Sequence, residues 1–441
     1  MAPHPQDPRD RAILAGLARD VARAIAAALT LTPGDHVCFL DGGIAVSAEH
    51  LRWATQAPPF AGTAEADDAR SFARIANTLP RADAPWSASP HALGELYRRW
   101  LETAQVPAHA LGPDDTRRLE QALATIQDLA AAYREHQQRW AEAERAWQAV
   151  ARAAATVPDR SRQLLACKAA LSTALQVWQT RGHKARFEAA VAERQAHAER
   201  GLPRMLAALR ARYDHAIAAN RGRDGEGFTP VTLSPPDLFD RAAAWTPIAL
   251  RTEGEVAASA HDPSHGGADL LWWTRQPGEP CSAVARGETR GVALSFDLAC
   301  ARVDREPWFD SYLLTSRSWW WPGASRAAPE AGGPLLSSGD PPPTTRGAWP
   351  LTPTAVVFAK NLRIDADVTD RTVLRARLAA APSAGLVCFT LRNAPGSPLA
   401  NGHDLTMTAS GQLVVAQPQI IAVVCQRMPK EPDPDLALLP G

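Results

Sequence analysis

Apolar side chains recur at alternating steps of four and three residues along the middle of the chain. The first run comprises Leu119, Leu123, Ile126, Ala130, Tyr133, Trp140, Trp147, Ala151 and Ala154, with Gln137 and Glu144 filling two gaps. Such a heptad repeat keeps one stripe of a helix against a partner helix. Asp114 and Asp115 suit the start of that helix as cap and as partners of the helix dipole. We therefore expect one helix from Asp114 to about Thr156.

A second run follows the break at Val157-Pro158-Asp159. Its members are Leu164, Leu171, Leu175, Trp178, Ala185, Phe187 and Val191. Gly201-Leu202-Pro203 interrupts the pattern, and a last helix is expected over Pro203–Asn220, because proline is tolerated in a first helical turn. Two arms with a short connection most simply pack as an antiparallel pair. The sequence thus predicts a coiled-coil helical hairpin over residues 113–220.

This hairpin has two interpretations. It is either a structural spacer, alone or bundled with a third helix, or an arm that rearranges and inserts into a membrane. The outer faces of both arms are dense in Arg, Glu and Gln. Neither arm contains the ~20 apolar residues that a membrane-spanning helix needs. Both features favour the spacer.

The region before the hairpin has the pattern of a small helical domain over residues 9–112, preceded by a proline-rich, disordered tail over residues 1–8. We expect helices over Asp10–Leu29, Ala64–Leu79 and Pro90–Gln105. His36–Leu40 is expected to be a short strand or an extended segment.

The region after the hairpin begins with a glycine-rich, charged segment, residues 221–227, which is typical of a hinge. Beyond it the period changes to two, most clearly at Val292, Leu294, Phe296, Leu298 and Cys300. Further strands are expected over Ala268–Arg275, Ser282–Arg286, Ser311–Trp320, Thr354–Asp367, Val373–Leu378, Leu386–Arg392, Leu405–Thr408, Gln412–Ala416 and Gln419–Arg427.

Many short strands without intervening helices predict a C-terminal β-sandwich over residues 228–428, followed by a tail over residues 429–441. A long irregular loop, residues 322–350, lies inside this domain, and loops of that length are usually functional or disordered. The expected fold class is therefore α+β and multidomain: an N-terminal helical cap, a long antiparallel hairpin and a β-sandwich.

Composition narrows the choice of partners. The 441 residues include 47 basic and 47 acidic side chains, and a net charge of zero argues against nucleic acid as a main partner. None of the six cysteines forms a C-x-x-C pair, so neither a zinc knuckle nor a redox motif is expected. The N-terminus lacks the pattern of a secretory signal, and we expect a protein that is cytoplasmic or released without a signal peptide.

Adjacent tryptophans are the first candidate binding residues. Trp319, Trp320 and Trp321 are consecutive, and the group is completed by Trp272, Trp273 and Trp308. Since neighbours in a strand point to opposite faces, at least one indole is expected to be exposed or covered by a loop. Exposed indoles suit protein partners, membrane surfaces and sugars, whereas a long loop folded over the outer ring would make the group part of a core.

Two acidic or histidine-containing segments are weak candidates for a metal site. His261, His265 and Asp269 belong to a segment that Pro263 makes a loop, so the two imidazoles do not share a helix face. Asp365, Asp367 and Asp370 lack the glycine and the distant glutamate of an EF-hand, which favours a strand end with exposed acids. We expect neither a metal nor a cofactor.

The chain contains none of the short phosphate-binding, dinucleotide-binding, serine-hydrolase or zinc-protease motifs. We therefore expect a non-enzymatic, modular protein, whose hairpin sets a distance or mediates self-association and whose sandwich binds a protein partner. One alternative is a toxin-like, pore-forming protein with a helical arm and a β recognition domain. The other is an enzyme with a cryptic site, which requires titratable groups converging in a deep pocket between the cap and the sandwich.

Overall fold

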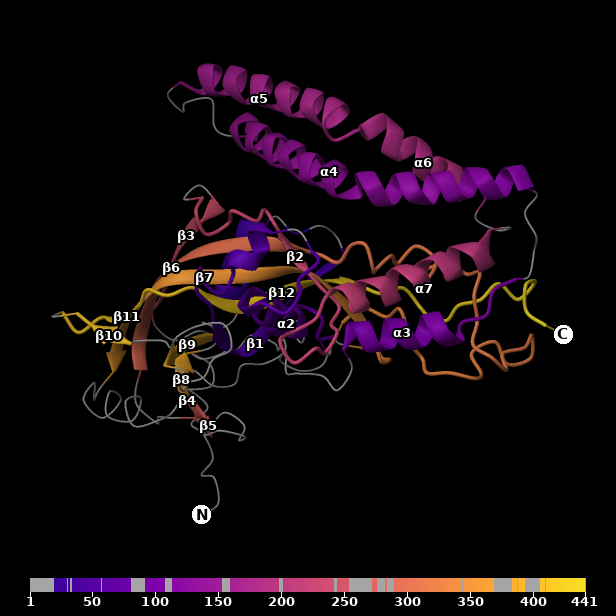
Figure 1. Ribbon diagram of the computed structural model, residues 1–441. Coiled ribbons are helices and arrows are strands. Elements are labelled where there is room, and N and C mark those ends of the chain that lie inside the picture. Colours follow the sequence, from indigo (N-terminus) through magenta and orange to yellow (C-terminus); the bar gives the residue numbers. More distant parts are fainter. Residues whose placement is uncertain are drawn as a thin grey trace, which may run out of the picture.

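The computed structural model describes residues 20–29, 31, 34–56, 58–80, 92–107, 113–152, 159–197, 201–241, 244–253, 272–275, 282–283, 289–342, 344–368, 383–386, 388–392, 405–408 and 410–440. These residues contain both helices and sheets, so the expectation of a mixed α+β fold is confirmed (Figure 1). The strand expected over Val373–Leu378 and the tail expected over residues 1–8 lie outside the described residues.

The long helices lie along one side of the molecule, over α7 and the larger sheet (Figure 1). They are α4, Pro113–Arg152, α5, Arg160–Thr180, and α6, Lys184–Ala196. The first arm is thus one long helix, as expected. The second arm was expected to be continuous, but it is two helices, because Gly182 and His183 leave the helical path and His183 has a φ of 48°.

Aromatic side chains of the heptad stripe hold the arms together where α5 meets α6. The ring of Tyr133 stacks on that of Phe187, with centroids 4.1 Å apart, and lies 5.3 Å from the ring of Trp178. Trp140 approaches Trp178 to 5.5 Å. Closer to the start of α4, a small core contains Ala122, Ile126, Ala190, Phe187 and Val191. The apolar stripe therefore does face a partner helix, as its spacing predicts.

The larger sheet is antiparallel and contains strands from both the beginning and the end of the sequence. Its main path is β1, Asp35–Ala45; β12, Gln419–Arg427; β7, Leu351–Val368; β11, Leu413–Val415; and β10, Thr406–Met407. β6, Thr289–Asp304, also pairs with β7 and carries β2, Thr232–Ser234, and β3, Thr246–Glu253. The smaller sheet is β5, Ser282–Ala283; β4, Trp272–Arg275; β8, Ser383–Leu386; and β9, Phe389–Arg392.

Two details of the strands differ from expectation. The segment around His36–Leu40, which we expected within a helical domain, is part of β1 and pairs with β12 near the other end of the chain. The strand expected over Ser311–Trp320 is wrong, because residues 312–318 form turns and bends. Its apolar residues Leu313, Leu314 and Trp319 are buried in the third core from a loop rather than from a pleated strand.

Both faces of the larger sheet are apolar because both are covered. One face presents Val356, Phe358, Val423 and Cys425 to Trp53 of the short helix η1, Arg52–Thr55, and to Phe72 of α2, Ala64–Ala76. The opposite face presents residues such as Leu298 and Val357 to Leu386 of β8 and Phe389 of β9. Adjacent residues of β7 thus enter different cores, as strand geometry requires.

A third core forms where loops meet α3, Leu93–Thr103, and α7, Leu202–Ala219. Its members include Tyr97, Trp100, Leu209, Tyr213, Trp308, Trp319, Trp321 and Trp349. The segment over residues 221–227, expected to be a hinge, is held against α2, since Arg70 contacts Asp224 at 2.6 Å and Asp67 accepts from the backbone amide of Arg223 at 3.0 Å.

Candidate functional site

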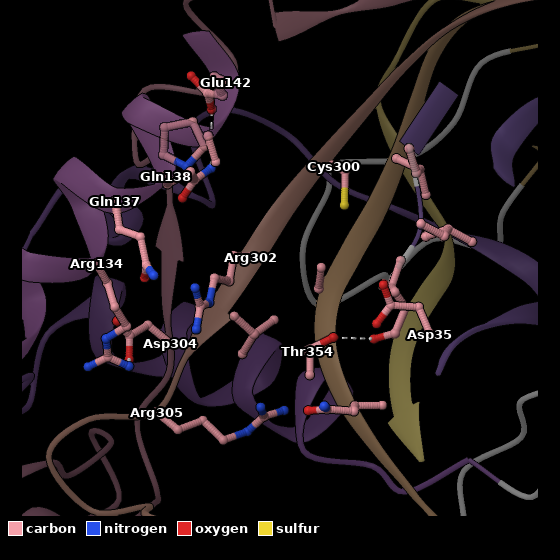
Figure 2. Close-up of a pocket in the computed structure, with 18 of the residues that line it drawn as sticks. Asp35, Arg134, Gln137, Gln138, Glu142, Cys300, Arg302, Asp304, Arg305 and Thr354 are labelled. Carbon is pink, nitrogen blue, oxygen red and sulfur yellow. Dashed lines mark hydrogen bonds and ion pairs between the residues drawn. The ribbon is translucent and has the colours of Figure 1, made fainter. Parts of the chain in front are cut away.

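A cleft of about 1730 Å³ separates α4 from the larger sheet. α4 forms one wall, and β6 forms much of the other with parts of β7 and β12 (Figure 2). The hairpin thus covers one side of the larger sheet but leaves a cleft between α4 and the sheet.

The wall formed by α4 carries a row of polar side chains among apolar ones. It presents Arg134, Gln137, Gln138, Ala141, Glu142 and Arg145, whose spacing of three or four residues places them on one helix face. Figure 2 shows the Arg134 and Gln137 side chains directed toward the sheet. The aromatic stripe containing Tyr133 and Trp140 contacts α5 and α6, so α4 serves two interfaces at once.

The wall formed by β6 continues a face that begins in the protein core. Leu294, Phe296 and Leu298 are buried under the smaller sheet, and the next residues on that face are Cys300, Arg302 and Asp304. The face becomes polar where it leaves the cover of β8 and β9. Our sequence pattern stopped at Cys300; continuing the period of two would have indicated Arg302 and Asp304.

Ion pairs connect the two walls. Arg134 of α4 lies 3.1 Å from the Asp304 carboxylate and also contacts Glu306. Arg194 of α6 lies 3.0 Å from Asp310, and its guanidinium stacks 4.1 Å from the ring centre of Tyr312. These contacts fix the middle and the base of the hairpin against the body of the protein.

Burial changes the pKa values of several groups here. It raises the pKa of Glu306 to about 7, although Arg134 opposes the change. It raises the pKa of the Cys300 thiol to about 12, so this thiol is protonated at neutral pH and is a poor nucleophile. The pKa of Arg302 is lowered, first by burial among protein atoms and next by the nearby positive charge of Arg134.

The charges in the cleft are not balanced. Every described carboxylate that lines it is engaged: Asp304 and Glu306 by Arg134, Asp310 by Arg194, Glu142 by Gln138, and Asp35 by a further contact. Among the described residues, no hydrogen bond or ion pair engages the guanidinium groups of Arg145, Arg302 and Arg427. The cleft therefore offers unpaired cations, the chemistry that binds carboxylates and phosphates.

The tryptophan candidates of the sequence lie elsewhere. Trp308, Trp319, Trp320 and Trp321 are all buried, so this group does not form an exposed surface. Trp321 packs against Gly333 of the long loop, and Trp320 packs against Leu439 near the C-terminus. Of the two outcomes expected for the outer ring, the structure shows the covered one. The polypeptide of Trp272 and Trp273 forms β4, and their side chains are not described.

The metal candidates of the sequence fall into two groups. His261, His265, Asp269 and Asp370 lie outside the described residues, while Asp365 and Asp367 belong to β7. Within the described part of the chain, no group of three or more His, Cys, Asp or Glu side chains could hold a metal ion. None of the described helices combines the length and apolar character needed to cross a membrane.

Comparisons with protein-family models, with curated proteins and with solved structures give no match for this chain.

Proposed function

We propose that this protein is a non-enzymatic binding protein, and that the cleft between α4 and the larger sheet receives an extended, acidic polypeptide segment. In this proposal the hairpin is one wall of the site. The larger sheet, which in this proposal packs with the smaller one as a β-sandwich, supplies the other wall.

The observation that carries the proposal is the unpaired positive charge of Arg302. Its side chain reaches solvent within the cleft, lies beside the cationic Arg134, and has no acidic partner among the described residues. Two neighbouring guanidinium groups repel each other, and a bound anion between them would offset that repulsion. A carboxylate can also accept two parallel hydrogen bonds from a guanidinium.

The size of the cleft favours a polypeptide over a small molecule. Pockets for drug-sized ligands enclose about 300–1,000 Å³, whereas this cleft measures about 1730 Å³. Apolar side chains that line it, including Leu29, Leu31 and Phe187, would contact the apolar residues of such a segment.

The test is a binding measurement with a fluorescein-labelled deca-glutamate peptide, followed by anisotropy at low ionic strength, where electrostatic contacts are least screened. We expect saturable binding to the wild type and a dissociation constant about tenfold higher for Arg302→Gln, the loss of one charge-assisted contact. Arg162→Gln is the matched control, because Arg162 lies on α5 outside the cleft with 85% of its side chain exposed. Equal binding by Arg302→Gln, or equal binding of a deca-lysine peptide, would refute the proposal.

A further inference from the structure

The outer half of the hairpin, defined as residues 137–151 of α4 together with α5, has a heptad stripe but no buried core of its own. Trp178 is the only fully buried apolar side chain in these described residues. Trp140, Trp147, Leu164 and Leu171 remain half-buried. Leu165 is 71% exposed.

Two helices cannot enclose an apolar stripe from all sides, whereas four helices can. We propose that the outer half of the hairpin packs against the same half of a second copy of this chain, forming a four-helix bundle. Its two-fold axis runs along the hairpin. In this arrangement α5 of each copy lies beside α4 of the other. The contacts that define this interface, at Glu144, Leu165 and Lys168, do not line the cleft, so the proposal is independent of the peptide-binding proposal.

The charges of the two helices are compatible in this arrangement. α5 carries Arg160, Arg162 and Lys168 and no acidic residue. The outer half of α4 is neutral overall, and because Glu142 and Arg145 line the cleft and Arg139 pairs with Glu135, Glu144 is the charge that remains for a partner. A partner for α5 must therefore be acidic or neutral, and α4 of a second copy meets that condition.

Two opposite charges, Glu144 and Lys168, also lie at the same distance from the end of the hairpin. Glu144 lies eight residues before the last residue of α4, and Lys168 lies eight residues after the first residue of α5. At a rise of 1.5 Å per residue, both lie about 12 Å from the end of the hairpin. Neither has an ion-pair partner among the described residues. In the two-fold bundle, Glu144 of each copy faces Lys168 of the other, and polar residues in a heptad stripe specify register.

The available area suits a specific dimer. The two helices present a face roughly 30 Å long and roughly 20 Å wide, or about 600 Å² per copy. Specific interfaces bury about 600–1,000 Å² on each partner.

Analytical ultracentrifugation of the full chain tests the proposal across a range of concentrations. We expect the wild type to sediment as a dimer, and Glu144→Lys alone or Lys168→Glu alone to raise the dissociation constant about tenfold or more. An equimolar mixture of the two single variants should recover dimerisation, because in the mixed dimer each position 144 again faces an opposite charge at position 168. If the two residues interacted only within one chain, mixing would recover nothing.

A second variant tests the apolar contact. Leu165→Asp changes an exposed side chain, so the folded chain should keep its circular dichroism spectrum and become monomeric. Leu436→Asp, at a leucine that is 50% exposed outside the hairpin, should remain dimeric. A wild type that stays monomeric, or a mixture that does not recover dimerisation, overturns the proposal. If the monomeric wild type instead co-sediments with phosphatidylserine vesicles, this face belongs to a membrane surface.

Discussion

Arg305 donates a hydrogen bond from Nε to Oδ1 of Asn77 at 2.7 Å, and both side chains are buried. Its other guanidinium nitrogens donate to the backbone oxygens of Ala76 and Pro353, each at 2.6 Å. Burial lowers the pKa of Arg305 to about 10, which still leaves it charged at neutral pH. One cation therefore joins the C-terminal end of α2, where the helix dipole is negative, to β7.

Replacing this cation should destabilise the fold strongly. Arg305→Met leaves the Asn77 side chain and two buried backbone oxygens without donors, and each such loss costs about 1–3 kcal/mol. We expect the free energy of unfolding to fall by about 3 kcal/mol or more in urea denaturation. Arg317→Met is the control, because Arg317 is 65% exposed, and its loss should change stability by less than about 1 kcal/mol. Similar stabilities for the two variants would contradict the proposed role of Arg305.

The buried carboxyl group of Glu431 should make stability depend on pH. Burial, followed by the nearby Asp433, raises the pKa of Glu431 to about 9. Because this folded-state pKa exceeds the unfolded value of 4.5, the contribution of protonated Glu431 is complete below pH 4.5 and is lost as the pH rises toward 9.

Glu431→Gln removes this titration and keeps a neutral side chain of similar shape. We expect it to stabilise the protein by about 3 kcal/mol at pH 7 and to have little effect at pH 4. Unfolding by urea at both pH values measures the difference. A variant that is equally destabilised at both would show that the carboxyl group serves packing alone.

The features that the sequence predicts well are those that local patterns encode. The heptad positions between Leu119 and Val191 indicate the hairpin because each contact joins residues on helices that lie close together in the sequence. The period of two from Val292 to Cys300 likewise indicates β6. The break at Gly182 is missed, because a single glycine within a helical pattern is compatible with a continuous helix.

Long-range relationships are not encoded in this way. The pairing of β1 with β12 joins residues such as Val37 and Val424, which lie almost the whole chain apart, and no local pattern specifies that partner. The cleft depends on Arg134 and Arg302 facing each other across two elements. The burial of Trp319, Trp320 and Trp321 depends on loops and on the C-terminal segment, so their adjacency alone suggested an exposed surface that does not form.

Gly182 should be essential to the geometry of the second arm. A Cβ atom there would lie 2.7 Å from both the backbone oxygen and Cδ1 of Trp178, and 3.0 Å from Cβ of His136. Gly182→Ala should therefore displace the buried Trp178 and reduce the free energy of unfolding by about 1–3 kcal/mol. Gln179→Ala, at an exposed position of α5, should stay within about 0.5 kcal/mol of the wild type. Equal urea midpoints for Gly182→Ala and the wild type would contradict this packing.

The cleft should bind acidic peptide more tightly as the pH falls through 7. Burial raises the pKa of Glu306 to about 7, so between pH 8 and pH 6 this carboxyl group takes up a proton and the cleft loses a negative charge. The positive charges of Arg134 and Arg302 are then less compensated, and the dissociation constant for deca-glutamate should decrease by about two- to tenfold. Glu306→Gln should bind deca-glutamate at pH 8 as tightly as the wild type does at pH 6. The affinity of this variant should not change between the two pH values. Anisotropy titrations of both proteins at the two pH values provide the measurement, and the same pH dependence in the variant would assign the titration to another group.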